Sequence, residues 1–306
     1  MKSLQRIVLS LLAVSISSMA CAQSEDRGLS PLVDLPEIVS CGGEATVGKM
    51  VAIMEPEYQG TKVHHMVYLP TNYDKSKKMP LIVEYTGNRW NYGNGTVEEA
   101  LLGYSLTLGR DFIWVVLPYI ALDGEQNQDL WWGDADATAE YARVVIPRIV
   151  EEYNADADNI ILCGFSRGSI GVSYIGLHDD ATAQLWSAFL SHDHFDGQQE
   201  WGGKSWGSPL EKYRTEAAER LKRVAGRSWL VCSQKPSSNY KDVIDQMGAS
   251  DYGVYSYLQI PTSERFEEIP NEYFAHPHTD RWALFDIPES DIVRKWLYDV
   301  SANIQK

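Results

Sequence analysis

The chain has 306 residues and carries 42 acidic against 27 basic side chains, a formal net charge of −15 at pH 7. An acidic surface repels phosphate groups, so nucleic acids and anionic membranes are unsuitable partners. One of the 4 cysteines lies in the leader segment described next, and the odd number that remains does not suit a disulfide framework.

Residues 1–22 are predicted to be a signal peptide. Lys2 and Arg6 precede an apolar run over 7–16, which is too short to span a bilayer, and Ala-Cys-Ala at 20–22 forms a small-residue cleavage site. This pattern predicts a secreted or periplasmic protein. Acylation of Cys21 is the alternative, although Ser18 stands where lipoprotein sites usually carry a Leu-like residue. We expect no transmembrane segment elsewhere.

The rest of the chain alternates between short apolar runs and helical patterns. Residues 23–60 lack clear periodicity and are predicted to form an N-terminal extension, followed by a catalytic domain over 61–306. Strands are expected at 65–69 (an edge strand), 81–85, 112–117, 160–163, 186–190, 228–232 and 254–260. Helices are expected at 136–153, with a kink at Pro147, and at 210–224 and 290–300. This order predicts a single α/β domain with a mostly parallel twisted sheet and helices on both faces.

A short segment with the pattern Gly-x-Ser-x-Gly follows the fourth of these strands. In Gly164-Phe-Ser-Arg-Gly168 the strand turns sharply into a helix and holds Ser166 in a strained, exposed position. Gly164 and Gly168 lack the Cβ atoms that would collide in such a turn. The free N–H groups of the following helix would face negative charge that develops beside Ser166. The pattern therefore indicates a serine nucleophile.

Two further segments complete a resemblance to a known family. Residues 80–87 end a strand in Tyr-Thr-Gly, and residues 276–280 read His-Pro-His-Thr-Asp close to the C-terminus. With the serine turn, they make residues 62–302 similar to the α/β-hydrolase superfamily. Within it, the chain resembles secreted serine esterases of the polyester-depolymerase, feruloyl-esterase and prolyl-oligopeptidase-like groups.

The resemblance implies a nucleophile, an acid and a base in that chain order. Ser166 would be the nucleophile, and His276 or His278 the base. We favour His278, because the residues after it look more like the start of the helix that follows the family's histidine.

The acid is where this sequence departs from the family pattern. No carboxylate follows the strand at 228–232 before Asp242, which falls in a predicted helix. The strand at 186–190 is followed instead by Asp193 and Asp196. We favour Asp196, since Asp-Gly suits a tight turn that could aim the carboxylate at the histidine.

The oxyanion of the reaction needs one N–H donor after the nucleophile and one from an earlier loop. We expect these from the backbone of Arg167 and of Gly87 and Asn88. The Arg167 side chain could also meet a bound carboxylate or the oxyanion. Trp131 and Trp132 are candidates for stacking on substrate, together with Trp201 and Trp206, although all four could instead cover the sheet edge.

Another hypothesis concerns His192, His194 and Asp196, whose spacing resembles the zinc motif of the metallo-β-lactamase superfamily. Gly197 occupies a position where that family usually has another histidine, and the α/β layout does not suit it. We therefore expect no metal and no cofactor.

The sequence predicts an exported serine hydrolase of the carboxylic ester class that forms an acyl-enzyme on a carbohydrate-linked or polymeric ester, such as a polysaccharide or polyester substrate. Alternatives are a prolyl-oligopeptidase-type peptidase, the zinc-dependent hydrolase, and a non-catalytic binding protein on the same fold. The oligomeric state is not predicted.

Overall fold

The computed structural model describes residues 29–39, 43–90, 95–201, 206–236, 238–265 and 276–303. The predicted signal peptide and Cys21 lie outside this part of the chain. None of the helices within these ranges is long and apolar enough to cross a membrane.

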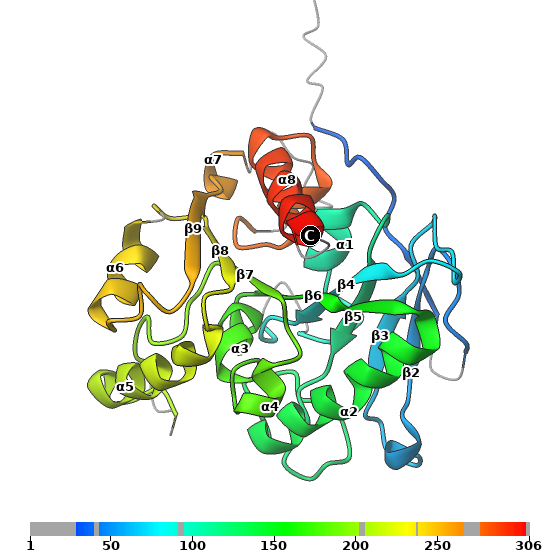
Figure 1. Ribbon diagram of the computed structural model, residues 1–306, viewed down its shortest axis with the longest axis horizontal. Helices are drawn as coiled ribbons and strands as arrows, with labels where there is room; N and C mark the ends of the chain where they lie inside the picture. Colours follow the sequence, from blue (N-terminus) through cyan, green and yellow to red (C-terminus); the bar gives the residue numbers. More distant parts are fainter. Residues whose placement is uncertain are drawn as a thin grey trace, which may run out of the picture.

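The described residues form one mixed sheet with the strand order β1-β2-β3-β5-β4-β6-β7-β8-β9 (Figure 1). Neighbouring strands from β5 to β9 run parallel, whereas β3 is antiparallel to both β2 and β5. The mostly parallel sheet predicted from the sequence is confirmed. Its strands are β1 (Glu37–Val39), β2 (Lys49–Ile53), β3 (His65–Tyr68), β4 (Met79–Tyr85), β5 (Ile113–Leu117), β6 (Ala155–Phe165), β7 (Ala188–His192), β8 (Ser228–Ser233) and β9 (Val254–Gln259).

Helices cover both faces of this sheet (Figure 1). Alternate side chains of β4 point to opposite faces: Leu81 and Val83 belong to one apolar cluster with α2 and α3, and Ile82 to a second cluster with α1 and α8. The α2 helix continues through Pro147. The helices are α1 (Leu102–Thr107), α2 (Ala135–Tyr153), α3 (Arg167–Tyr174), α4 (Asp180–Ala183), α5 (Leu210–Leu221), α6 (Ser238–Gln246), α7 (Thr262–Arg265) and α8 (Pro288–Asn303), with the 3-10 turns η1 (Pro56–Tyr58), η2 (Lys222–Val224) and η3 (Arg281–Leu284).

The sheet begins earlier in the chain than the sequence suggested. Within the segment expected to be an extension, β1 and β2 pair with each other, and β2 pairs with β3. The apolar run from Met50 to Ala52 is buried by this pairing. As a result, β3 has neighbours on both sides and is not the edge strand that its alternating pattern predicted. Cys163 in β6 and Cys232 in β8 are buried free thiols.

The carboxyl ends of β4, β6, β7 and β8 meet at one edge of the sheet, where ligand sites of open parallel sheets lie. Two backbone hydrogen bonds fix the residues just beyond these ends. Ser166 donates its N–H to His192 at 3.0 Å, and Asp193 donates its N–H to Cys232 at 3.0 Å. Ser166 and Asp193 are thus placed on adjacent turns by the register of the strands.

Candidate active site

The turn at Ser166 has the strained geometry predicted for a nucleophile. Its φ of 57° and ψ of −118° lie in a region that non-glycine residues rarely adopt. A Cβ atom on Gly164 would lie 2.2 Å from the Gly168 carbonyl oxygen, and one on Gly168 would lie 1.8 Å from the Tyr85 carbonyl oxygen. Both glycines are therefore required by the close approach of β6, α3 and β4.

A hydrogen-bonded series connects this serine to a histidine and a carboxylate. His278 Nε2 lies 3.0 Å from Ser166 Oγ, and His278 Nδ1 lies 2.9 Å from Asp193 Oδ2. Gln234, just beyond β8, donates its backbone N–H to Asp193 Oδ1 at 2.7 Å and its side-chain amide to Oδ2 at 3.0 Å. The carboxylate is thereby fixed against the imidazole ring, which contacts the serine hydroxyl with its other nitrogen.

The charge of this carboxylate is set by its surroundings. Burial favours the neutral form, but the neighbouring imidazoles of His192 and His278 and the Gln234 N–H outweigh it and lower the pKa of Asp193 to about 2. Burial also lowers the pKa of His194 to about 4 and lowers that of His192. At neutral pH Asp193 is therefore ionised.

The choice of Asp196 as the acid is corrected by the structure. Asp196 is completely buried, and its carboxylate accepts hydrogen bonds from Ser173 Oγ at 2.8 Å and from Arg220 Nε at 2.9 Å. Asp242 is exposed on α6. Asp193, the other carboxylate considered after this strand, is the one in contact with His278. Its position as the first residue beyond β7 was the signal that sequence reasoning underweighted.

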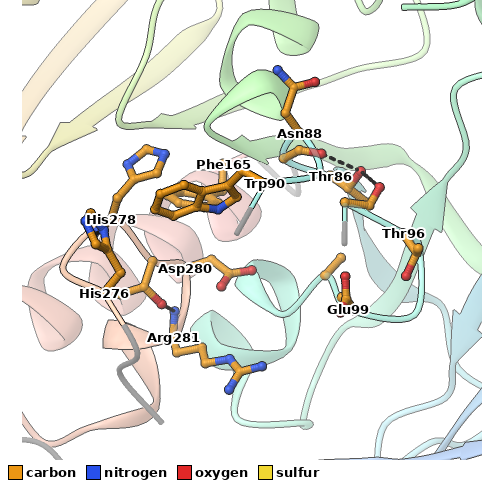
Figure 2. Close-up of a pocket in the computed structure, with 14 residues that line it drawn as sticks. Thr86, Asn88, Trp90, Thr96, Glu99, Phe165, His276, His278, Asp280 and Arg281 are labelled. Carbon is orange, nitrogen blue, oxygen red and sulfur yellow. Dashed lines mark hydrogen bonds between the residues drawn. The ribbon is translucent and has the colours of Figure 1, made fainter. Parts of the chain in front are cut away.

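His278 rather than His276 contacts the serine, as the sequence analysis favoured. His276 Nδ1 accepts the backbone N–H of His278 at 3.0 Å. Its ring packs edge-on against Trp90, with centroids 4.9 Å apart. Figure 2 shows both histidines beside the Trp90 ring, at the wall of a cavity of about 130 Å³.

Two of the residues expected to supply oxyanion donors, Gly87 and Asn88, line this cavity. A Cβ atom on Gly87 would be 3.5 Å from Ser166 Cβ, so the loop after β4 passes next to the nucleophile. Arg167 is the first residue of α3, where backbone N–H groups lack helical carbonyl partners. The Asn88 side chain is bonded to the Trp131 loop: its Oδ1 accepts the backbone N–H of Trp131 at 2.6 Å. The assignment of the backbone donors remains a prediction.

The side chain of Arg167 is buried and bonded to loop groups, which does not suit the ligand-binding role considered for it. It is 1% exposed, and its guanidinium lies 4.0 Å over the ring of Tyr119. Burial lowers the pKa of Arg167 to about 10. The guanidinium donates to Trp131 O at 2.6 Å, Thr86 Oγ1 at 2.9 Å, Gln128 O at 3.2 Å, Gly95 O at 3.3 Å and Thr86 O at 3.4 Å. All five N–H groups of the guanidinium are thus hydrogen-bonded. Through them Arg167 connects the segments at Thr86, at Gly95 and at 128–131 to the serine turn.

The two adjacent tryptophans differ in role. Trp132 is 3% exposed and stacks on Tyr174 with centroids 4.6 Å apart, so it is a core residue and not a substrate contact. Trp131 is half-buried and lies 5.1 Å from Trp206 and 5.5 Å from Trp201 between ring centroids. Only Trp131 of the pair remains a candidate for binding substrate.

The three residues of the zinc hypothesis have other partners in the structure. His192 is buried between the rings of Phe165 and Trp282, each with its centroid 5.5 Å away, and Asp196 is held by Arg220. His194 packs against the ring of Trp201. Across the described ranges, no group of three His, Cys, Asp or Glu side chains is arranged to hold a metal ion.

Comparison with known proteins identifies the fold. No family model and no curated protein matches the chain. Among solved structures it resembles a sugar hydrolase from Lactococcus lactis, with 12% identity over 84% of this chain and 100% of that chain at a TM-score of 0.53. Esterase B from Lactobacillus rhamnosis matches with 13% identity over 86% and 90% of the two chains at 0.50. A thermostable esterase matches with 15% identity over 82% of this chain but only 62% of that chain, at 0.47.

The chain has the α/β-hydrolase fold, in a single domain with a mostly parallel sheet and flanking helices. It is distantly similar in structure to esterases and other hydrolases.

Proposed function

We propose that this protein is a serine hydrolase that cleaves carboxylic esters through an acyl-enzyme. The observation that carries the proposal is the hydrogen-bonded series from Asp193 through His278 to Ser166. Its members lie on adjacent turns at the carboxyl edge of the sheet. The strained backbone of Ser166 supports the same role.

In the proposed mechanism Ser166 Oγ attacks the ester carbonyl carbon while His278 Nε2 takes its proton. The carbonyl oxygen becomes an oxyanion that accepts N–H bonds from Arg167 and from Gly87 or Asn88. The oxyanion then re-forms the carbonyl and expels the alcohol, which takes the proton from His278. Water repeats these steps on the acyl-enzyme and releases the acid.

Asp193 has a supporting role in this mechanism. Because it stays ionised, it holds the imidazole proton of His278 on Nδ1 and leaves Nε2 free to accept the serine proton. Its negative charge also stabilises the imidazolium formed in the transition state. The arrangement argues against a non-catalytic binding protein, for which a fixed acid–base series has no use.

For the substrate we propose a carbohydrate-linked or polymeric ester. The likeness to the sugar hydrolase and to esterase B is compatible with this class. We propose no cofactor, because the three residues use only proton transfer and acyl transfer.

The function is tested by labelling the purified protein with a fluorophosphonate probe, which reacts with an activated serine. We expect labelling of the parent protein and of Ser76→Ala, a control on an exposed turn, but none of Ser166→Ala. Hydrolysis of p-nitrophenyl acetate is expected to follow the same pattern, with a loss of about 10⁶-fold in kcat in Ser166→Ala. Labelling that persists in Ser166→Ala would exclude this serine as the nucleophile.

Export is a separate proposal that depends only on residues 1–22. Mass spectrometry of protein recovered from a host with a secretion pathway should give a mature N-terminus at Gln23. A diacylglyceryl-modified Cys21 as the first residue would instead support the lipoprotein alternative.

A further inference from the structure

A groove of about 560 Å³ is lined in part by Trp131, the hydrogen-bond partner of Asn88. The residues that give it its chemical character are Leu122, Asp123, Gln126, Gln128, Trp131 and Trp206. Leu122 is 82% exposed, so an apolar side chain stands at the surface beside two indole rings. Asp123 is the one charged residue among the described residues that line the groove.

The central tryptophan of this groove is held in an unusual conformation. Trp131 has a φ of 57°, which a bulky residue adopts only when its surroundings impose it. Its backbone N–H donates to Asn88 Oδ1, and its backbone carbonyl oxygen accepts from Arg167 Nη1 at 2.6 Å. Strained residues held in this way cluster at ligand sites, because a rigid contact surface binds at a lower entropic cost.

The groove is linked to the residues around Ser166 by two sets of contacts. Asn88 lines the cavity beside His278, and its hydrogen-bond partner Trp131 lines the groove, so one hydrogen-bonded pair connects the linings of the two spaces. A series of rings makes the same connection on the other side. Trp131 packs on Trp201, Trp201 on His194, and His194 on His278, with centroids 5.5, 4.9 and 5.5 Å apart.

The lining residues indicate the chemistry of the occupant. Indole faces bind the apolar C–H faces of sugar rings, and the Gln126 amide can bond to hydroxyl groups, as can the Oε1 of Gln128, whose Nε2 donates to Leu130 O at 2.6 Å. An aliphatic polyester offers no hydroxyl along its chain for these amides. Asp123 repels anionic sugars such as uronates, and no lysine or arginine among the described lining residues offsets this charge.

We propose that this groove binds the neutral carbohydrate part of a carbohydrate ester while its acyl group lies at Ser166. The inference rests on the proposed function for the identity of the reacting centre. It adds the substrate class and a specificity residue, Trp131.

The test measures binding apart from catalysis. Isothermal titration calorimetry of the full chain with Ser166→Ala would use cellohexaose, xylohexaose and mannohexaose, with hexagalacturonate as the anionic probe and a 3-hydroxybutyrate trimer as the polyester probe. We expect at least one neutral oligosaccharide to bind, and Trp131→Ala to weaken it about ten-fold. Trp296→Ala, a half-buried tryptophan on α8, is the matched control and should leave binding unchanged.

A second variant covers the case in which Trp131→Ala does not fold. Gln126→Leu changes an exposed side chain of the groove and should weaken neutral oligosaccharides without changing the circular dichroism spectrum. The inference is overturned if no neutral oligosaccharide binds, if hexagalacturonate or the polyester trimer binds more tightly, or if the groove variants bind as well as the control. Fluorophosphonate labelling of Ser166 would still stand in each case, so failure here is distinct from failure of the proposed function.

Discussion

Asp193 and Asp196 are three residues apart beyond the same strand, and both are at most 3% exposed, yet their surroundings differ. Asp193 faces the imidazole of His278, whereas Asp196 faces the guanidinium of Arg220 at 2.9 Å. An imidazole gains and loses a proton near neutral pH, but a guanidinium does not. Burial disfavours the charge of Arg220, and Asp196 nevertheless raises its pKa above the ordinary value. The partner, rather than the carboxylate or its burial, therefore separates a site suited to proton transfer from a structural ion pair.

The largest expected effect that tests this comparison is on catalysis. Asp193→Asn should reduce kcat for an activated ester by about 10⁴-fold, because an amide can hold the histidine in the wrong tautomer. The fold should persist, as judged by far-UV circular dichroism at pH 7. A loss of less than about ten-fold in kcat would mean that Asp193 does not act through His278.

The matching substitution at Asp196 should act on stability instead. Asp196→Asn leaves Arg220 charged and buried without its partner, which costs about 3–5 kcal/mol of unfolding free energy in urea titrations. The double variant Asp196→Leu with Arg220→Met should recover most of this loss, because no buried charge remains. If Asp196→Asn instead abolished turnover in protein that is still folded, the contrast between the two carboxylates would be lost.

Acid titration provides a smaller difference between these residues. The native pKa of Asp193 is about 2, against about 3.9 in an unfolded chain, so its ionised form favours the folded state. This contribution of about 2–3 kcal/mol is complete above pH 4 and is lost as the pH falls towards 2. Unfolding free energies measured from pH 5 to pH 2 should decline more steeply in the parent protein than in Asp193→Asn. Parallel curves would contradict the lowered pKa.

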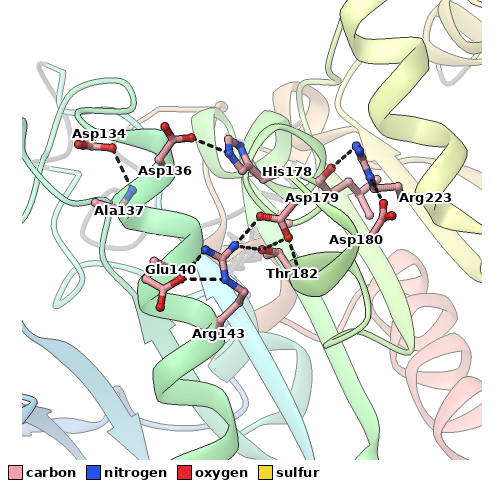
Figure 3. A network of polar contacts seen from close by, with 12 residues as sticks. Asp134, Asp136, Ala137, Glu140, Arg143, His178, Asp179, Asp180, Thr182 and Arg223 are labelled. Atoms are coloured by element: carbon pink, nitrogen blue, oxygen red, sulfur yellow. Dashed lines mark hydrogen bonds and ion pairs between the residues drawn. The ribbon is translucent and has the colours of Figure 1, made fainter.

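The smallest effect is expected for ion pairs at the surface. Figure 3 shows Arg143 on α2 between Glu140 and Asp179, with Arg143 Nη1 also donating to Thr182 Oγ1 at 2.8 Å. Water screens these charges, since the Glu140 and Asp179 side chains are 60% and 41% exposed. Arg143→Met should therefore cost no more than about 1 kcal/mol in a urea titration and less at high salt. A loss as large as that of Asp196→Asn would show that burial is not the deciding factor.

The sequence predicted much of the sheet because its central strands are continuous apolar runs. Residues 81–85, 112–117 and 228–232 all lie within or overlap strands buried on both faces. The serine turn could be predicted as well, since Gly164 and Gly168 are required by backbone contacts. By contrast, β2 was missed because five residues give too short a pattern to separate from a loop.

Residue type alone could not decide which aspartate is the acid or what role Arg167 has. Asp193 faces His278 through a backbone φ of 72°, a conformation that the sequence does not reveal, whereas the Asp196-Gly197 pair gave a local turn signal that proved unrelated to the histidine. The role of Arg167 depends on carbonyl groups of loops that are distant in sequence. Such contacts exist only once the sheet has brought the loops together.

The contacts of Arg167 have a consequence for how the edge of the sheet opens. One guanidinium bonds to the loop after β4, to Gly95 and to the loop that carries Trp131. Segments that share a buried anchor tend to unfold locally as one cooperative unit. Amide hydrogens around Thr86, Gly95 and Trp131 should therefore exchange with solvent at a common rate. Arg167→Met should accelerate that exchange together at all three places, while exchange in β5 stays slow.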